Sequence, residues 1–178
     1  MGKSHDLATI ATDGLPTLEV DTIKNTSGTT GLTIDSAGRM LTPARPAFHA
    51  KKSGSAAWQS LGGANTQVVI PLDATTYNVG GHYNTSNYRF TAPVAGVYFF
   101  HAQIYHDANS YFQVRLKLND NDLVFSQNRE QGTTKSASIS YQLAVNDYVE
   151  VTGLISNSDS DDWYSASTYS YFCGHLLG

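Results

Sequence analysis

The residue types that could support catalysis gather in one short segment, where two histidines stand near an aspartate and a serine. His101 and His106 are five positions apart, and Asp107 and Ser110 follow them. An odd interval along a β-strand places side chains on opposite faces, so the two imidazoles are not expected to share a metal ion or a proton relay. His101 is better explained as an interface residue and His106 as a strand-end residue. We therefore expect no catalytic residues and no enzymatic activity.

The second candidate site is the most acidic stretch of the chain, NSDSDDW at residues 157–163. Asp159, Asp161 and Asp162 supply carboxylate oxygens, the ligands that Ca²⁺ prefers. The stretch lacks the Asp-x-Asp-x-Asp-Gly pattern of an EF-hand, and a calcium site needs more ligands than this loop shows. The alternative interpretation is a solvated turn of Asp and Ser. The sequence requires no cofactor, and calcium is the candidate that it suggests.

Aromatic residues near expected loop tips form the third candidate, a binding surface. Aromatic rings beside amides and carboxylates suit sugar rings, and Tyr and Trp also anchor protein interfaces. Trp163 stands in a polar stretch, where an exposed indole would give a flat apolar anchor. Core packing is the alternative explanation for Tyr169 and Tyr171. The candidate binding residues are Asn109, Tyr111, Asn157, Trp163 and Tyr164.

Composition limits the class of protein. The 178 residues, 40% of them hydrophobic, suffice for one globular domain and an appendage. A net charge of −4 provides no basic patch, so nucleic acid is not an expected partner. The single cysteine, Cys173, excludes an intrachain disulfide and lies in an apolar run that indicates a buried thiol. The chain has no stretch of 18 apolar residues, so no membrane-spanning segment is predicted. Its first residues, MGKSHDLATIATDG, do not resemble a signal peptide.

From residue 47 onward, apolar residues recur with period two between turn signals. In FQVRLKLND, one face carries Phe112, Val114, Leu116 and Leu118. In SASISYQLAV, one face carries Ala137, Ile139, Tyr141 and Leu143. No helical period persists, so the pattern predicts an all-β sandwich of about eight to ten strands.

The stretch GVYFFHAQIYH, residues 96–106, is apolar on both faces of the expected strand. One face carries Tyr98, Phe100, Ala102 and Ile104, which can fill the core. The other face carries Val97, Phe99, His101, Gln103 and Tyr105. This second face is too apolar to face water, so it needs cover from outside the protomer. Oligomerisation is the simplest cover.

Residues 1–46 form an N-terminal arm with a different composition from residues 47–178. Short alternations such as LEVDTI and GLTI are separated by turn signals, and their apolar surface is too small for an independent core. Two interpretations stand: a flexible linker, or short strands that need a partner surface. That partner would be a sister chain or an anchoring protein.

The ordered motifs of residues 47–178 resemble the C1q-like globular domains of the C1q and tumour necrosis factor superfamily. The matching stretches are YNVGGHYNTSNYRFTAPVAGVYFFHAQI, VRLKLNDNDL, SASISYQLAVNDYVEV and YSYFCGHLLG. The resemblance implies a ten-stranded jelly-roll sandwich that assembles as a homotrimer, with an inner sheet facing the threefold axis. It places the outward residues of the strand at 96–106 in the trimer interface. The segment 157–163 is similar in position to loops that supply carboxylates to calcium clusters at the apex of some C1q-like trimers.

The arm, in TIKNTSGTTGLTIDSAGRMLTPARPAF, resembles segments that precede C1q-like heads in bacteriophage tail-fibre and virion-surface proteins. We therefore expect a non-enzymatic phage protein, made in the host cytoplasm without a signal peptide and localised to the virion surface or tail. Its arm would dock to other virion structural proteins, and its head would bind a host-surface glycan or protein. The alternatives are a purely structural decoration or fibre-assembly protein, and a secreted C1q-like recognition ligand.

Overall fold

A computed structural model describes residues 21–107, 111–128, 132–155 and 162–178. The chain divides into two units, Met1–Ala44 and Arg45–Gly178. The second unit, called the head below, begins two residues before the boundary expected from the sequence. Every regular element of the described residues is a strand, so the all-β prediction is confirmed.

The first unit contains a small antiparallel sheet of β1 (Thr22–Lys24), β2 (Thr30–Ile34) and β3 (Met40–Leu41). Its two turns are built alike. Asn25 Oδ1 accepts hydrogen bonds from the backbone N–H groups of Ser27 and Thr29, and Asp35 Oδ1 accepts those of Ala37 and Arg39. Each turn then uses a glycine with positive φ, at positions 28 and 38.

One layer of the head is a seven-stranded sheet centred on β10 (Gly96–His106). β10 pairs along its whole length with β13 (Thr133–Leu143). Its other edge pairs first with β16 (Tyr171–Leu176) and then with β15 (Asp162–Tyr164). The remaining strands are β4 (Ala47–Lys51) and β7 (Ala74–Val79) beyond β16, and β5 (Trp58–Ser60) beyond β15.

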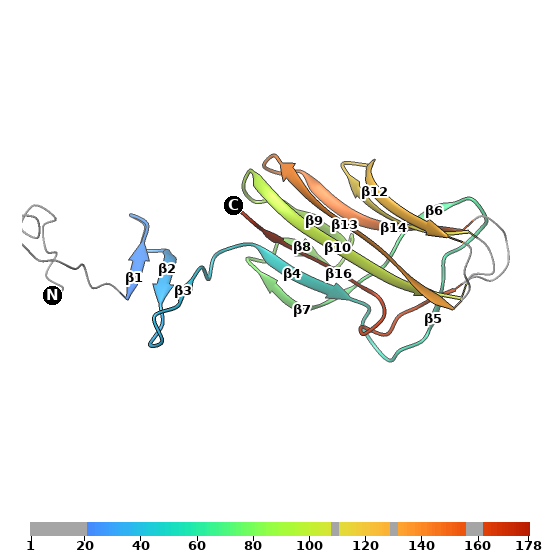
Figure 1. Ribbon diagram of the computed structural model, residues 1–178, viewed down its shortest axis with the longest axis horizontal. Coiled ribbons are helices and arrows are strands. Elements are labelled where there is room, and N and C mark those ends of the chain that lie inside the picture. Colours follow the sequence, from blue (N-terminus) through green and yellow to red (C-terminus); the bar gives the residue numbers. More distant parts are fainter. Residues whose placement is uncertain (1–20, 108–110, 129–131, 156–161) are drawn as a thin grey trace, which may run out of the picture. The chain divides into compact units, whose positions relative to one another are not determined.

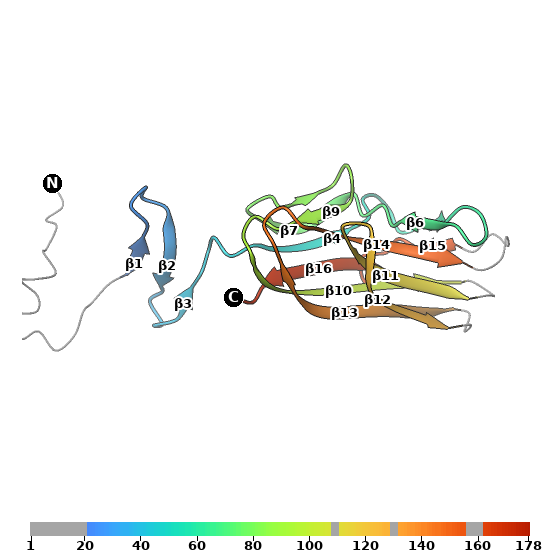
Figure 2. The same ribbon diagram turned by 90° about the horizontal axis from the view of Figure 1, so that it is seen from above.

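The other layer is a six-stranded antiparallel sheet (Figures 1 and 2). Its central pair is β11 (Phe112–Leu118) and β14 (Tyr148–Ile155), which pair in continuous register. β12 (Asn121–Asn128) pairs with β11. β6 (Gln67–Val69) and β9 (Arg89–Thr91) pair with β14, and β8 (Tyr83–Asn84) pairs with β9.

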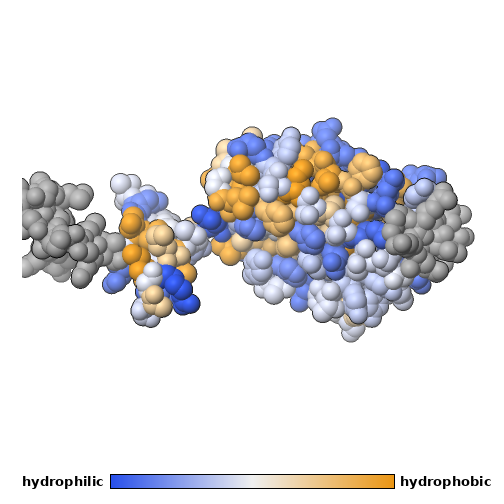
Figure 3. Space-filling view, viewed as in Figure 1, coloured by the Kyte–Doolittle hydropathy of each residue, from blue (hydrophilic) through white to orange (hydrophobic). Residues whose placement is uncertain are grey.

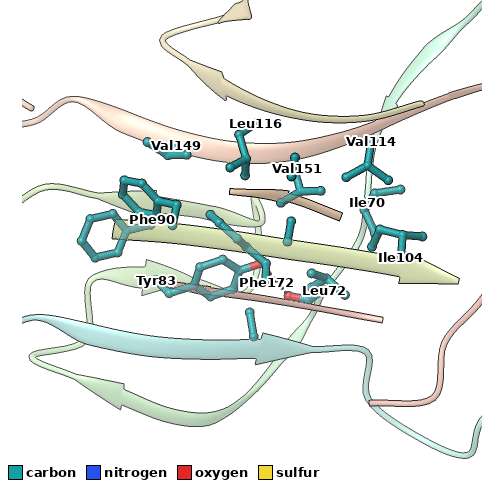
Figure 4. Close-up of a cluster of buried hydrophobic side chains, with 14 of the residues drawn as sticks. Ile70, Leu72, Tyr83, Phe90, Ile104, Val114, Leu116, Val149, Val151 and Phe172 are labelled. Atoms are coloured by element: carbon teal, nitrogen blue, oxygen red, sulfur yellow. Dashed lines mark hydrogen bonds between the residues drawn. The ribbon is translucent and has the colours of Figure 1, made fainter. Parts of the chain in front are cut away.

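The core between the two sheets is rich in aromatic rings (Figure 4). Phe48 of the seven-stranded sheet stacks on Tyr83 and Phe90 of the six-stranded sheet, with centroid distances of 5.0 Å in both pairs. Phe172 meets Phe48 edge-on at 4.8 Å. The hydroxyl of Tyr83 donates to the carbonyl of Leu72 at 2.9 Å, so this buried phenol keeps a hydrogen bond. These contacts join the two layers.

The predicted faces of the long strands are largely confirmed. The core-facing residues of β10 are all fully buried: Tyr98, Phe100, Ala102 and Ile104. Phe112, Val114 and Leu116 of β11 are fully buried as well. In β13, Ala137 and Leu143 are buried, while Tyr141, on the same face, is 42% exposed.

Gly174 lies where β16 passes against β10 without room for a side chain. A Cβ at this position would lie 2.5 Å from Cδ1 of Phe100 and 2.9 Å from the carbonyl oxygen of Phe99. We expect Gly174→Ala to lower the free energy of unfolding by about 1–3 kcal/mol, because the buried ring and the backbone must both shift. Gly63→Ala is the control, since its Cβ would meet only Thr66 Oγ1 at 3.9 Å. Equal urea midpoints for the two variants would contradict the close packing at Gly174.

The ring of His106 is fully buried at the end of β10 and stacks on Phe112 with a centroid distance of 4.2 Å. Burial, with a contribution from the nearby Lys135 charge, lowers the pKa of His106 to about 4. The unfolded chain binds a proton here near pH 6.5, whereas the folded chain does so only near pH 4. Stability from this residue is therefore complete above pH 6.5 and falls as the pH drops toward 4.

We expect this loss to reach about 3 kcal/mol, at roughly 1.36 kcal/mol per pKa unit. Urea unfolding at several pH values between 4 and 7 measures it. His106→Phe keeps a ring against Phe112 and should flatten this part of the profile. An unchanged pH profile in His106→Phe would show that the ring at 106 does not carry the effect.

Candidate functional site

The outward side of β10 is the candidate site, here called the outer face. Strict alternation along β10 buries every second residue and leaves the intervening ones half-buried. The half-buried residues are the predicted interface residues: Val97, Phe99, His101, Gln103 and Tyr105. They lie on the solvent side of the seven-stranded sheet, because their neighbours in the sequence fill the core.

Three residues form a row across the outer face. The strand register pairs His101 of β10 with Cys173 of β16, and Cys173 with His49 of β4. Such cross-strand neighbours lie within side-chain contact distance on one face of the sheet. The Nδ1 atom of His49 also lies 3.1 Å from Thr76 Oγ1.

Burial keeps this row uncharged near neutral pH. It lowers the pKa of both His49 and His101, because the imidazolium form is poorly solvated there. It raises the pKa of the Cys173 thiol for the same reason, since the thiolate is the charged form. The three groups therefore present neutral side chains, which can be covered by another surface at low desolvation cost.

Aromatic contacts extend the outer face along the strands. The Tyr171 ring packs against His49 and His101, with centroid distances of 5.2 and 5.6 Å. Phe99 meets His175 at 5.6 Å. The centre of the face is thus a layer of rings with few charges, which suits packing against a second protein surface more than chemistry on a substrate.

The prediction that Trp163 forms an exposed binding anchor is wrong. The indole is fully buried, because β15 pairs Trp163 with His106 and both side chains point to the core side of the sheet. Its neighbour Tyr164 points the other way, is half-buried and pairs across the sheet with Tyr105. The polar residues before Trp163 therefore gave a misleading indication of its environment.

The other predicted binding and metal residues are only partly described. Tyr111 is half-buried just before β11. Asn109, Asn157, Asp159 and Asp161 lie outside the described residues, and Asp162 begins β15 without a described side chain. Within the described ranges, no group of three or more His, Cys, Asp or Glu residues could hold a metal ion. In the same ranges, no helix is long and apolar enough to cross a membrane.

Several outer-face residues were not identified as candidate site residues from the sequence. His49 and Cys173 join the site only through the pairing of β4, β16 and β10. Trp58 enters through the pairing of the three-residue strand β5 with β15. Neither relationship leaves a local pattern, because each depends on contacts between segments far apart in the chain.

Comparisons with known proteins find similar sequences and folds. A complement C1q tumor necrosis factor-related protein 6 from Rattus norvegicus is 30% identical over 110 residues, which cover 60% of this chain and 41% of that protein. The globular domain of a zebrafish complement 1qA protein matches with a TM-score of 0.58 at 16% identity, covering 75% of this chain and 98% of that one. Murine APRIL matches with a TM-score of 0.58 at 10% identity, covering 75% and 99%. These folds confirm the predicted jelly roll.

The expectation of virion localisation without a signal peptide is wrong. The similarity to the rat C1q tumor necrosis factor-related protein points to secretion and not to a virion. Nothing in the comparisons shows a bacteriophage context, so the phage resemblance of the arm carries no further argument.

The domain resemblance, in contrast, is confirmed over most of the chain. The profile of the C1q domain matches residues 47–177, which includes every strand of the head from β4 to β16. The chain belongs to the C1q domain family.

Proposed function

We propose that this protein is a non-enzymatic, secreted C1q-type recognition ligand whose heads assemble as a homotrimer through the outer face. The observation that supports the trimer is the outer side of β10, where Val97 and Phe99 are half-buried in the single protomer. Apolar side chains on the open side of a sheet favour cover by another protein surface. A second and a third copy of the same face provide that cover in a closed assembly.

The composition of the outer face supports self-association. Its row of His101, Cys173 and His49 carries no charge near neutral pH, because burial opposes both imidazolium and thiolate. Like-charge repulsion between copies is therefore absent from this row. Further apolar side chains are exposed near one end of the head, at Val94, Val145 and Leu177. Figure 3 shows apolar surface mixed with polar surface on one side of the head.

We assign recognition to the loops of the head. Loops on a rigid sandwich can vary without disturbing the core. Asn109 and Tyr111 belong to one such segment and Asn157 to another, and Tyr164 lies on the strand β15 that follows it. Asp159, Asp161 and Asp162 remain the candidate ligands if calcium takes part. Trp163 is removed from this set because its indole is buried.

We assign an assembly role to the first unit. Its small sheet leaves large apolar side chains exposed, with Ile23 at 54%, Met40 at 73% and Leu41 at 46%. Three short strands bury too little surface to be stable alone. The same segment of neighbouring copies is a suitable partner, because identical strands offer matching edges and faces.

Phe99→Asp should dissociate the trimer or leave the head insoluble. Burying this ring contributes about 2 kcal/mol per protomer, and a carboxylate in its place must be desolvated. Phe125→Asp is the matched control, because Phe125 is a 50% exposed ring on β12 of the opposite sheet. Light scattering should show a trimer for the wild type and for Phe125→Asp. A monodisperse wild-type monomer would overturn the proposed assembly.

Residues 45–178 alone should fold and form the same trimer. The core and the outer face are both built from residues of the head. Circular dichroism measures the folding of this fragment, and light scattering measures its mass. A folded fragment that stays monomeric, beside a trimeric full chain, would transfer the assembly function to residues 1–44.

A further inference from the structure

Four aromatic rings gather at the end of β10, beyond the centre of the outer face. The strand register places Tyr105, Tyr164 and Trp58 in one row across β10, β15 and β5. Tyr169 joins them from the turn before β16, with its ring centroid 5.4 Å from that of Tyr105. The four rings line a cavity of about 300 Å³. We call this cluster the aromatic cup.

The rings of the cup surround a common space and do not form one flat platform. Neighbouring centroids are 5.1 to 6.2 Å apart, and the planes are tilted by 40° to 73° relative to one another. A sugar ring or a nucleobase stacks best on a flat face. Mutually tilted rings instead present several faces to one compact, rounded group. A group held over the middle lies within about 6 Å of several centroids, the reach of cation–π attraction.

Hydrogen bonds between side chains and the backbone hold the segments of the cup in place. Ser165 Oγ donates to the carbonyl of Ala57 at 2.8 Å and accepts from the N–H of Ala57 at 3.0 Å, which fixes the strand carrying Trp58. Gln103 Nε2 donates to the carbonyl of Tyr169 at 3.2 Å. Ser170 Oγ accepts from the N–H of Tyr105 at 3.1 Å. The rings are therefore preorganised, which lowers the entropic cost of binding.

The charge around the cup favours a cation. The four lining residues are three tyrosines and one tryptophan, and the whole chain carries a net charge of −4. The carboxylate of Asp107 lies near the rim, because Asp107 Oδ1 and the Tyr105 hydroxyl both lie close to Gly132. A Cβ at position 132 would be 3.7 Å from the hydroxyl and 3.9 Å from the carboxylate oxygen. The nearest basic residue on β13, Lys135, is buried and bonds to the carbonyl of Thr134.

We propose that the aromatic cup binds a trimethylammonium group, such as that of choline. This group is rounded, carries a delocalised positive charge and has no N–H bonds, so it loses no hydrogen bonds when rings replace water around it. The cavity has the volume of the smallest ligand sites, which suits one small head group. Trp58 and Tyr169 remain 44% and 48% exposed, so a ligand can enter from solvent. The proposal goes beyond trimer formation and does not require it.

Calorimetry on the full chain tests the proposal with choline chloride. The matched ligand is 3,3-dimethylbutan-1-ol, which has the same shape without the charge. We expect choline to bind and the neutral alcohol to bind at least about tenfold more weakly, because the charge supplies the attraction. Equal binding of the two would overturn the proposal and leave an apolar pocket. Binding of glucose or galactose in place of choline would overturn it in favour of a sugar site.

Variants of the cup locate the binding. Trp58→Ala should weaken choline binding about fivefold or more, the effect of one cation–π contact, and Trp58→Phe should fall between it and the wild type. Phe125→Ala removes a similarly exposed ring on the opposite sheet and should leave binding unchanged. Equal loss in Trp58→Ala and Phe125→Ala would reject the cup as the site.

Two further measurements separate this proposal from the proposed trimer and from a lipid source. Light scattering on every variant records the oligomeric state. Choline binding by a monomeric protein would overturn the proposed trimer and leave the cup in place. A trimer that does not bind choline would overturn the cup and leave the proposed trimer in place. Vesicles of phosphatidylcholine test the lipid head group. We expect free choline to bind and the vesicles not to sediment the protein, because a cavity of about 300 Å³ accepts one small group. Sedimentation by vesicles with no binding of free choline would overturn the small-molecule assignment.

Discussion

The structure depends on the double use of β10, which must satisfy two apolar environments with one alternating sequence. Tyr98 and Phe100 fill the core, whereas Phe99 and His101, one position away from them, lie on the outer face. A shift of one residue in the pairing with β16 would exchange the two sets. Because both sets are largely apolar, hydrophobicity alone does not select the register. The close approach of Gly174 to Phe100 does, since only this register places a residue without a side chain against the ring.

Burial controls charge on both sides of the same sheet. His106 is neutral inside because it stacks on Phe112 in the core, and its pKa falls to about 4. His49 and His101 are neutral outside because neighbouring rings and strands exclude part of their solvent. The same physical effect therefore serves two purposes. It allows an imidazole to complete the core at the end of β10, and it leaves the outer face free of charges that a second copy would have to desolvate.

Long strands were predictable from the sequence, and short ones were not. The alternation in β10 and β11 extends over enough residues to reveal which side chains are buried, and the structure agrees. β15 has three residues, too few for a period, and the pairing of Trp163 with His106 is a long-range contact. Polar neighbours therefore suggested a loop where a core indole lies.

The outer side of β10 combines two surfaces of different chemistry along one strand. Near its start, Val97 and Phe99 offer apolar side chains that favour a second copy of the chain. Six residues after Phe99, Tyr105 belongs instead to a group of tilted rings with a cavity between them. At the rise of a β-strand, that interval is about 20 Å, so the two surfaces are separate in space. Assembly at one end can therefore hold several aromatic cups in a fixed arrangement, and such an arrangement would increase the avidity for a ligand displayed in many copies.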